Sequence, residues 1–452
     1  MKETNKMGLK PVFPLLMSMA FPPMISMLIQ SLYNIVDSMF VAQIGEQALT
    51  AVSLAFPIQS LIIACSVGIG VGLNSYIARK LGEKDIVEAN SAILHGLLLS
   101  TIASLLFMVI GTLIIPSFFH MFTDDPIIYK MSCDYTYICV LFCCGCFYHI
   151  CIEKVFQSTG KMIFPMAIQA IGAILNIILD PILIFGWFGF PALGVKGAAI
   201  ATVLSQIVAA IISFYILLTK EHDVKVDVAN FHFHFDCIKK ILMVGIPNAC
   251  MNALNSVLVI GLNTILINFS NAAVAVFGVY FKLQTFVFMP ASGLSQGAMP
   301  IMSYNYGAGY HKRLHEAIRY AILVTGFIMI SGFALFETFP TVLLSLFDAN
   351  EEMIAIGLPA LRIIGFSFIP ATFGFIFPTL FQAMGLGVHA LFIFLLRQCI
   401  ITLPLAFILS KPFGLIGIWV CFIIAETISA IAAYGIYRFI KKRDHILSRT
   451  LA

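Results

Sequence analysis

Long apolar segments follow one another along almost the entire chain, with short polar stretches between them. A helix needs about 20 predominantly apolar residues to cross the hydrocarbon core of a bilayer. Twelve segments meet this requirement, and we expect each of them to span the membrane as a helix. The expected spans are 12–44, 48–77, 93–115, 132–153, 163–185, 197–218, 241–268, 272–302, 318–340, 354–382, 388–409 and 415–438.

The composition excludes a water-soluble protein. Hydrophobic residues make up 60% of the 452 residues and charged residues only 11%, whereas soluble domains contain about 25% charged residues. Too few polar side chains are present to cover one or two soluble domains, so lipid must be the solvent for most of the chain. The sequence therefore predicts an all-α polytopic membrane protein with twelve transmembrane helices.

Positive charge is distributed unequally between the two sides of the membrane. Most of the 26 Lys and Arg residues lie in the N-terminal segment and in loops on the same side, whereas the opposite loops hold Lys130, Lys196 and Lys411. Loops rich in Lys and Arg remain in the cytoplasm. We therefore expect both termini in the cytoplasm. We also expect a multi-pass protein of a bacterial plasma (inner) membrane.

The two halves of the chain repeat each other. Polar, aromatic, Gly and Pro residues coincide at an offset of 225 residues (247 − 22) over a long stretch, after which the offset falls to 220 (414 − 194). Chance coincidence in an apolar sequence is the alternative. The matched pairs are Pro22 with Pro247, Gln59 with Gln284, Gly68 with Gly293, Gly72 with Gly297, Gly82 with Gly307, Phe122 with Phe347, Gln157 with Gln382, Gly160 with Gly385, Gly194 with Gly414 and Gly197 with Gly417.

Because both halves begin in the cytoplasm, this is a parallel repeat with a pseudo-two-fold axis along the membrane normal. Such duplications are typical of secondary transporters, in which the substrate path runs between the halves near the midplane. The sequence predicts an N-lobe at 1–218, a polar cytoplasmic linker at 219–240 and a C-lobe at 241–452.

Few charged residues lie at membrane depth, where each one costs about 2.5–3.5 kcal/mol on insertion scales and so requires a reason. We expect Glu337 at the outer interface and Glu153 beside Lys154 as a solvated pair at the inner one. The full set is Asp37, Glu153, Asp180, Lys282, Glu337, Arg362, Arg397 and Glu426.

Asp37 has polar neighbours on its own helix face. Tyr33 and Asn34 precede it by four and three residues, so the three side chains share one face of a helix. A carboxylate with oxygen neighbours can ligate a hard cation or carry a proton. A carboxylate satisfied by hydrogen bonds between helices is the alternative.

Asp180 lies in a similar setting. Asn176 precedes it by four residues, and Pro181 removes one backbone donor from the helix ladder, which frees a carbonyl as a further oxygen ligand. Thr202 adds a hydroxyl on a following helix rich in small residues, which also permit close helix packing. The alternative for Asp180 is a position at the outer interface beside a loop.

The second half lacks the corresponding polar residues, because Leu262 matches Asp37 and Ile401 matches Asn176. We therefore expect cation chemistry in the N-terminal half alone. A C-lobe pathway would instead involve Lys282, Arg362, Arg397 and Glu426. A structural ion pair between Arg397 and Glu426 is the alternative for those two residues.

No motif of an enzyme or of an ATP-driven pump is present. The sequence has no GxxxxGK[ST] loop, and no Ser/His/Asp or metal-binding arrangement stands out. The cysteines gathered between Cys133 and Cys151 are interpreted as small apolar side chains. We expect no enzymatic activity, no cofactor and no metal other than a coupling Na⁺, so an ion gradient or downhill flow must supply the energy.

Several of these segments resemble motifs of the MATE transporter family. Residues 30–41 are similar to its first helix, and residues 176–181 with 194–202 are similar to its fifth and sixth helices. Residues 288–297 and 304–307 resemble the eighth helix of the bacterial MepA-like branch. The motifs at 157–160 and 382–385 match those after helices four and ten, so the resemblance covers nearly the whole chain.

This resemblance implies twelve helices in two lobes, alternating access, and export of cationic amphipathic drugs in exchange for Na⁺ or H⁺. The family's N-lobe cation site corresponds to Asp37, Asn176, Asp180 and Thr202 here. Some branches place a carboxylate in helix seven where this chain has Asn255, which argues against a C-lobe cation site.

The expected partners are small cationic drugs, the coupling cation and membrane lipids, with no nucleic acid and with a monomeric protein. A flippase for lipid-linked saccharides or lipids, from the same fold superfamily, is the alternative. Few cationic residues lie at membrane depth to hold a large anionic headgroup, which argues against it. A receptor or scaffold without transport is a third class and explains the duplicated bundle poorly.

Overall fold

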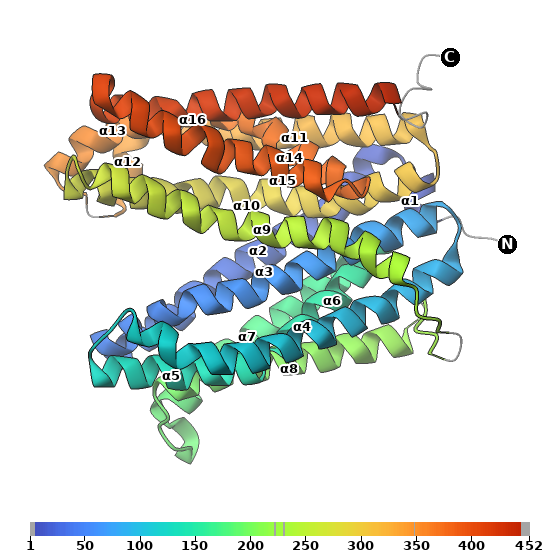
Figure 1. Ribbon diagram of the computed structural model, residues 1–452, viewed down its shortest axis with the longest axis horizontal. Helices are drawn as coiled ribbons and strands as arrows, with labels where there is room; N and C mark the ends of the chain where they lie inside the picture. Colours follow the sequence, from blue (N-terminus) through green and yellow to red (C-terminus); the bar gives the residue numbers. More distant parts are fainter. Residues whose placement is uncertain (1–4, 221–222, 229–230, 348, 444–452) are drawn as a thin grey trace. The chain divides into compact units, whose positions relative to one another are not determined.

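The computed structural model describes residues 5–220, 223–228, 231–347 and 349–443. The protein is all-helical over these residues, with no strand among them (Figure 1). The first half contains α1 Lys6–Leu9, α2 Val12–Ile44, α3 Glu46–Gly82, α4 Ile86–His120, α5 Pro126–Leu141, α6 Cys144–Ser158, α7 Ile163–Phe185, η1 Trp187–Gly189 and α8 Val195–Thr219. The second half contains α9 Phe235–Leu266, α10 Asn271–Gly307, α11 His311–Thr338, α12 Pro340–Ser345, α13 Glu351–Gly365, α14 Phe368–Ala383, α15 Gly387–Leu395, the π-helical η2 Leu396–Ile401 and α16 Thr402–Arg443.

Nine helical runs in the described residues are long and apolar enough to cross a membrane, and two bent helix pairs each supply one more. The last run, Gly387–Arg443, is broken at Gly414, whose φ of 57° and ψ of −140° are not helical. Leu409 and Gly417 would be about 12 Å apart in one continuous helix. A Cβ on Gly417 would nevertheless lie 2.2 Å from the Leu409 carbonyl oxygen, so the chain turns back at Gly414. This run holds two predicted spans, and the predicted twelve-helix fold is confirmed.

The backbone repeats as the sequence predicted. The α5–α6 pair bends by 47° and the α13–α14 pair by 50°, at corresponding positions of the two halves. Gly160 and Gly385 have φ values of 78° and 84°, and Gly194 and Gly414 have φ values of 56° and 57°. A side chain disfavours this left-handed region, which explains why glycine stands at both members of each pair.

The contacts divide the chain into two compact units. One, here called the N-unit, is Ile25–Ala249, and the other, the C-unit, combines Met1–Met24 with Cys250–Ala452. Both boundaries fall inside a helix, α2 in one case and α9 in the other. The division into lobes at the linker 219–240 remains a prediction, and residues 221–222 and 229–230 of that linker lie outside the described residues.

Matched glycines allow close helix contacts within each unit. In the N-unit, a Cβ on Gly72 of α3 would lie 2.1 Å from the Ile241 carbonyl oxygen of α9. In the C-unit, a Cβ on Gly297 of α10 would lie 2.6 Å from the Ala20 Cα of α2. Backbones can approach this closely only where neither residue carries a side chain toward the other helix. The repeat therefore preserves a helix–helix contact, and not only a sequence pattern.

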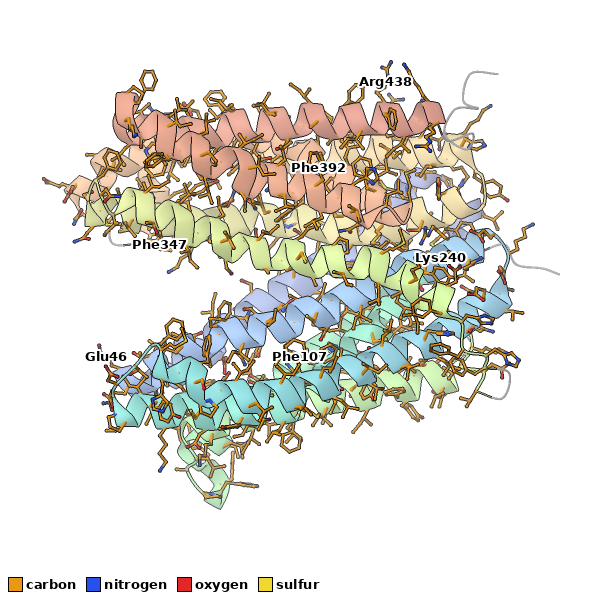
Figure 2. All side chains as sticks on the ribbon, in the orientation of Figure 1. Glu46, Phe107, Lys240, Phe347, Phe392 and Arg438 are labelled. Carbon is orange, nitrogen blue, oxygen red and sulfur yellow. The ribbon has the colours of Figure 1, made fainter. Side chains whose placement is uncertain are left out.

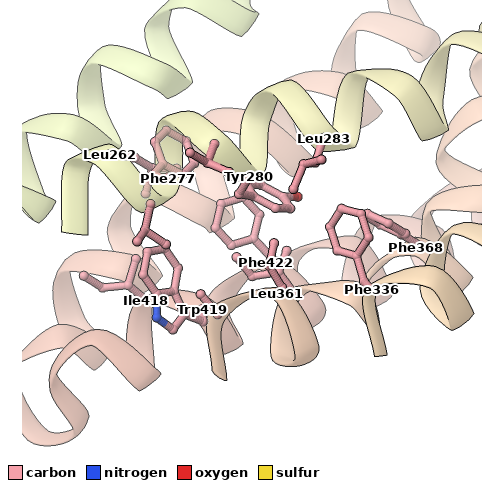
Figure 3. Close-up of a cluster of buried hydrophobic side chains, with 14 of the residues drawn as sticks. Leu262, Phe277, Tyr280, Leu283, Phe336, Leu361, Phe368, Ile418, Trp419 and Phe422 are labelled. Carbon is pink, nitrogen blue, oxygen red and sulfur yellow. The ribbon is translucent and has the colours of Figure 1, made fainter. Parts of the chain in front are cut away.

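The C-unit is centred on a cluster of buried aromatic residues, drawn in Figure 3. Phe277 and Tyr280 of α10 pack against Phe422 of α16, with ring centroids 6.4 and 5.7 Å apart. Tyr280 also contacts Phe336 of α11 edge to face at 6.4 Å. Outward-facing apolar side chains, such as the exposed Phe392 on α15, project from the helices in Figure 2, as expected for lipid-facing surface.

Candidate functional site

The structure brings Asp37 of α2 and Asp180 of α7 together inside the N-unit. The two carboxyl groups lie within hydrogen-bonding distance of each other. Asp180 is completely buried and Asp37 is half-buried. Asp180 is therefore not exposed beside the loop that follows α7, and its depth in the membrane stays a prediction.

Asn176 links Asp180 to α8. With the amide oriented to satisfy both neighbours, its nitrogen donates to Asp180 Oδ2 at 2.9 Å and its oxygen accepts from the Thr202 backbone nitrogen at 3.1 Å. The Thr202 hydroxyl oxygen lies 3.4 Å from the same amide. Asn176 and Thr202 are 1% and 7% exposed, so this bridge is shielded from solvent. One helical turn between Asn176 and Asp180 produces the alignment.

Tyr33 joins the site, whereas Asn34 does not. The Tyr33 hydroxyl is hydrogen-bonded to that of Thr202, and the ring lies next to both aspartates. Asn34 is exposed, and its backbone carbonyl accepts a hydrogen bond from Ser38 Oγ at 2.8 Å. A difference of one residue rotates a helical side chain by about 100°, enough to direct Asn34 away from Asp37.

Two side chains that we did not predict as site residues also border the site. Tyr135 of α5 is 2% exposed and lies next to Asp37 and Tyr33. Gln59 of α3 donates to the Tyr135 hydroxyl at 3.0 Å and to Cys139 Sγ at 3.4 Å. Gln59 carried a signal in the sequence, because it is a polar residue in an apolar span and is conserved in the internal repeat as Gln284. Tyr135 carried none.

One carboxylate oxygen of each aspartate, Oδ1 of Asp37 and Oδ1 of Asp180, is buried without a hydrogen-bond partner among the described residues. Buried polar atoms are normally paired, so these two oxygens indicate a bound proton, cation or water between the helices. The side chains of the site provide two carboxyls, an amide and two hydroxyls. These are the oxygen ligands suited to Na⁺, and the adjacent carboxyls are equally suited to sharing a proton.

The four charged C-unit residues do not form one site. Lys282 is exposed, and its ammonium lies 5.8 Å from the centre of the Phe347 ring. Arg362 forms an exposed ion pair with Glu337 at 3.7 Å. Arg397 and Glu426 instead form a buried ion pair, with Arg397 Nε 2.6 Å from Glu426 Oε1 and each side chain 9% exposed.

Asn255, where some MATE branches have a carboxylate, takes part in a neutral contact. Gln398 of η2 donates to Asn255 Oδ1 at 2.9 Å. Leu262, the counterpart of Asp37, is completely buried in the aromatic cluster of the C-unit (Figure 3). The polar groups of the two units are therefore different, although the helices repeat.

The expectation of a solvated Glu153–Lys154 pair is wrong. Lys154 Nζ lies 3.1 Å from Glu153 Oε1 and donates to Gln157 Oε1 at 3.0 Å, and the two charged side chains are only 13% and 6% exposed. Gly70 of α3 makes this burial possible, since a Cβ there would lie 2.6 Å from Lys154 Cγ. The lysine stem lies against the glycine.

Comparisons with known proteins agree with this architecture. The MatE family model matches residues 22–182 and 247–408. The matched segments begin 225 residues apart (247 − 22), the offset of the internal repeat, and together they cover more than half of the chain.

Two curated relatives and two solved structures extend over nearly the whole chain. A FAD transporter of Shewanella oneidensis is 28% identical over 449 residues, 96% of each protein. The multidrug export protein MepA of Staphylococcus saprophyticus is 28% identical over 446 residues, 96% of this chain and 95% of the relative. An outward-facing multidrug resistance MATE family transporter of the MOP superfamily has a TM-score of 0.90 and 26% identity, covering 97% of this chain and 98% of that one. A MOP superfamily transporter from Pyrococcus furiosus has a TM-score of 0.90 and 26% identity, covering 98% of this chain and 100% of that one.

A duplicated twelve-helix fold, two aspartates in contact inside the N-unit and a family match in both halves lead to the same conclusion. The chain belongs to the MatE family, and it is a multi-pass membrane transporter rather than an enzyme.

Proposed function

We propose that this protein exports amphipathic organic cations from the cytoplasm in exchange for protons bound at the Asp37–Asp180 pair. The observation that carries the proposal is the contact between these two carboxyl groups. Two carboxyls can form a hydrogen bond only when one of them holds a proton, because two carboxylates at that distance repel each other. The pair is therefore suited to gain and lose a proton during each transport cycle.

Alternating access would couple this proton to the cargo. Each proton that binds to the Asp37–Asp180 pair makes the charge of the α2–α7 contact one unit less negative. This change alters how strongly the two helices are held together. A conformational equilibrium responds to a ligand in proportion to the difference in its affinity for the two states. A proton that binds more tightly in one facing state, and a drug that binds more tightly in the other, would drive exchange.

The nature of the cargo rests on relatives and on composition. The MepA relatives are named multidrug export proteins. The chain contains 41 Phe and 20 Met residues, which provide adaptable contacts for aromatic cations, although lipid-facing surface uses the same residues. The N-unit site itself is acidic, and an acidic site attracts organic cations and protons alike.

Sodium is the second candidate for the coupling ion, because the oxygen atoms of Asp37, Asp180 and Thr202 converge. Flavin adenine dinucleotide is the second candidate for the cargo, since one relative is named a FAD transporter. FAD is an anion, and it would have to use the basic residues of the C-unit. The following experiment includes both alternatives.

Purified protein in liposomes loaded with ethidium should release the dye when a pH gradient alone is imposed. Asp37→Asn and Asp180→Asn should each lower this proton-driven flux to the level of empty liposomes. Asp134→Asn is the matched control, because Asp134 is a partly exposed carboxylate at 3.2 Å from Lys196 and lies outside the site. This control should transport as the wild type does.

Imposing a Na⁺ gradient at constant pH distinguishes the two ions, and replacing ethidium with FAD distinguishes the two cargoes. Flux driven by a Na⁺ gradient but not by a pH gradient would show that the coupling ion is Na⁺ and not the proton. Undiminished proton-driven flux in Asp37→Asn would remove the acidic pair from the mechanism.

A further inference from the structure

We propose that Glu426, in the C-unit, is a second proton-binding site of the transporter and that Arg397 is its internal counter-ion. This site shares no residue with the Asp37–Asp180 pair, which lies in the N-unit. The inference therefore goes beyond the proposed function and does not require that the first pair couples to protons.

Glu426 lies deep within the membrane. Its helix runs on from the turn at Gly414 to Arg443, and Glu426 is eleven residues beyond Leu415. At about 1.5 Å per residue this is about 17 Å along the helix, near the middle of a hydrocarbon core about 30 Å thick. A charged side chain at that depth is a candidate functional group, because neither bulk water nor lipid headgroups can solvate it.

The pair is enclosed by aromatic rings. Arg397 Nε lies 2.6 Å from Glu426 Oε1. The Arg397 guanidinium carbon is 6.0, 5.6 and 5.7 Å from the ring centres of Phe288, Phe375 and Phe394. The faces of these rings can stabilise a cation even when its carboxylate partner is neutral. Arg397 thus has a means of keeping its charge in both protonation states of Glu426.

Three buried oxygen atoms at this site lack hydrogen-bond partners among the described residues. They are Glu426 Oε2, the Tyr280 hydroxyl and Ser429 Oγ, in residues that are 7%, 1% and 0% exposed as a whole. Ser429 follows Glu426 by three residues, and Tyr280 interacts electrostatically with both members of the ion pair. Buried oxygens are rarely left unpaired, so the unpaired Oε2 marks the position where a proton would complete the site.

The backbone of α14 covers the ion pair closely. A Cβ on Gly374 would lie 3.2 Å from Arg397 Nη1 and 3.4 Å from Glu426 Oε2. Even one methyl group on this side would touch both members of the pair. A proton requires no cavity, whereas an organic ligand would require one, so the close cover favours a proton as the ligand.

Arg397 lies in an irregular helical segment. The residue lies in η2, the π-helical segment Leu396–Ile401, and the Thr402 hydroxyl donates to the Arg397 backbone carbonyl. π-Helical turns inside membrane helices occur frequently at functional sites, because the widened turn has alternative hydrogen-bond arrangements. The corresponding stretch of the first half lies in the regular helix α7.

Among the described residues, the charged and titratable groups that interact with Glu426 are Arg397 from η2 and Tyr280 from α10, and Cys421 of α16 interacts with Tyr280. When a proton binds to Glu426 Oε2, the carboxylate becomes a neutral carboxylic acid. The attraction that holds Arg397 against α16 then weakens. The site would thereby alternate between a closed ion pair and a loosened one.

Infrared difference spectroscopy of the protonated carboxyl C=O stretch tests this directly. In an ester-free detergent, and in a chain carrying Asp37→Asn and Asp180→Asn, raising the pH should remove a buried carboxylic-acid band. Glu426→Gln should abolish this band, while Glu337→Gln should keep it, since Glu337 belongs to the exposed pair with Arg362. A spectrum that Glu426→Gln leaves unchanged at every pH would overturn the proposal, because Glu426 would then be permanently ionised.

Removing one partner of a buried ion pair can prevent folding. The double variant Arg397→Gln/Glu426→Gln avoids a lone buried charge and provides a second test in a chain with an intact N-unit pair. If Glu426 binds a proton, the rate of dye export by this variant should depend less steeply on pH than the wild-type rate does. The difference should correspond to one proton, which is at most tenfold per pH unit. A purely structural pair predicts that the double variant recovers the wild-type profile, and that result would also overturn the proposal.

Discussion

At the scale of single residues, the energetic cost of burying polar groups predicted most of the candidate site. The hydrogen bonds in the structure identified its other residues. Asp37, Asn176, Asp180 and Thr202 could be predicted because a polar side chain at membrane depth must have a partner or a function. Tyr135 could not, because a tyrosine in an apolar span is common and its role depends on how α5 packs against α3. Asn34 was misplaced because sequence spacing identifies a helix face only to within about one residue.

Tyr33 provides a prediction at this scale. Tyr33→Phe removes the hydroxyl that is hydrogen-bonded to Thr202 but keeps the ring beside Asp37. The loss of one such bond is worth about 0.5–1.5 kcal/mol, so we expect proton-driven dye export to fall by about twofold to tenfold. Export by liposomes carrying Tyr33→Phe, Tyr215→Phe and wild type should be compared. Tyr215 is exposed and should be insensitive; a larger loss for Tyr215→Phe would contradict the assignment.

At the scale of helices, apolar length predicted the spans, whereas capping residues determined where the helices begin. Our span 132–153 corresponds to α5 and α6, and α5 begins earlier, at Pro126. Asp125 caps it by accepting from the Ile127 nitrogen at 2.8 Å, and Pro126 occupies the first turn. Apolar length measures only the part of a helix in lipid, so helices that extend into water have ends that hydropathy cannot locate.

The α3–α9 contact yields a prediction about stability. Gly72→Ala would place a methyl group 2.1 Å from the Ile241 carbonyl oxygen, so we expect a loss of about 1–3 kcal/mol in the free energy of unfolding. Gly278→Ala is the control, since nothing lies within 4 Å of its Cβ position and alanine favours the helix. Thermal unfolding in detergent should show a lower midpoint for Gly72→Ala alone. Equal midpoints for the two variants would contradict the contact.

The turn at Gly414 yields a second prediction about stability. A residue with a side chain is strained at φ 57° and ψ −140°, by about 1–3 kcal/mol. Gly414→Ala should therefore lower the unfolding midpoint, and Gly435→Ala in the regular part of α16 should not, because its Cβ position is also open. If Gly435→Ala were the more damaging change, the chain reversal at Gly414 would be wrong.

At the scale of the whole molecule, the helices repeat but the polar residues do not. The N-unit holds two aspartates in contact, and the C-unit holds an arginine–glutamate pair and an aromatic cluster in their place. The repeat could be predicted from glycine and proline, which are constrained by backbone geometry in both halves. The pairing of Arg397 with Glu426 was one of two sequence interpretations, because spacing cannot show which charged residues on different helices meet.

Orientation in the membrane is a prediction at this scale. The charge distribution predicts a cytoplasmic C-terminus, and the last turn of α16 is basic, with Lys441, Lys442 and Arg443. Green fluorescent protein fused to the C-terminus should fluoresce in bacterial cells, and alkaline phosphatase fused there should be inactive. The reverse pattern would place the termini outside and reverse the direction of the proposed export.

The exchange of protons for drug at the Asp37–Asp180 pair can be measured as drug-driven proton movement. Liposomes containing the protein and a trapped pH-sensitive dye, with no gradient imposed, should show protons moving against the drug when ethidium is added outside. We predict this movement for wild type and for Asp134→Asn, and its loss in Asp37→Asn and in Asp180→Asn. Proton movement of wild-type size in either site variant would contradict the account.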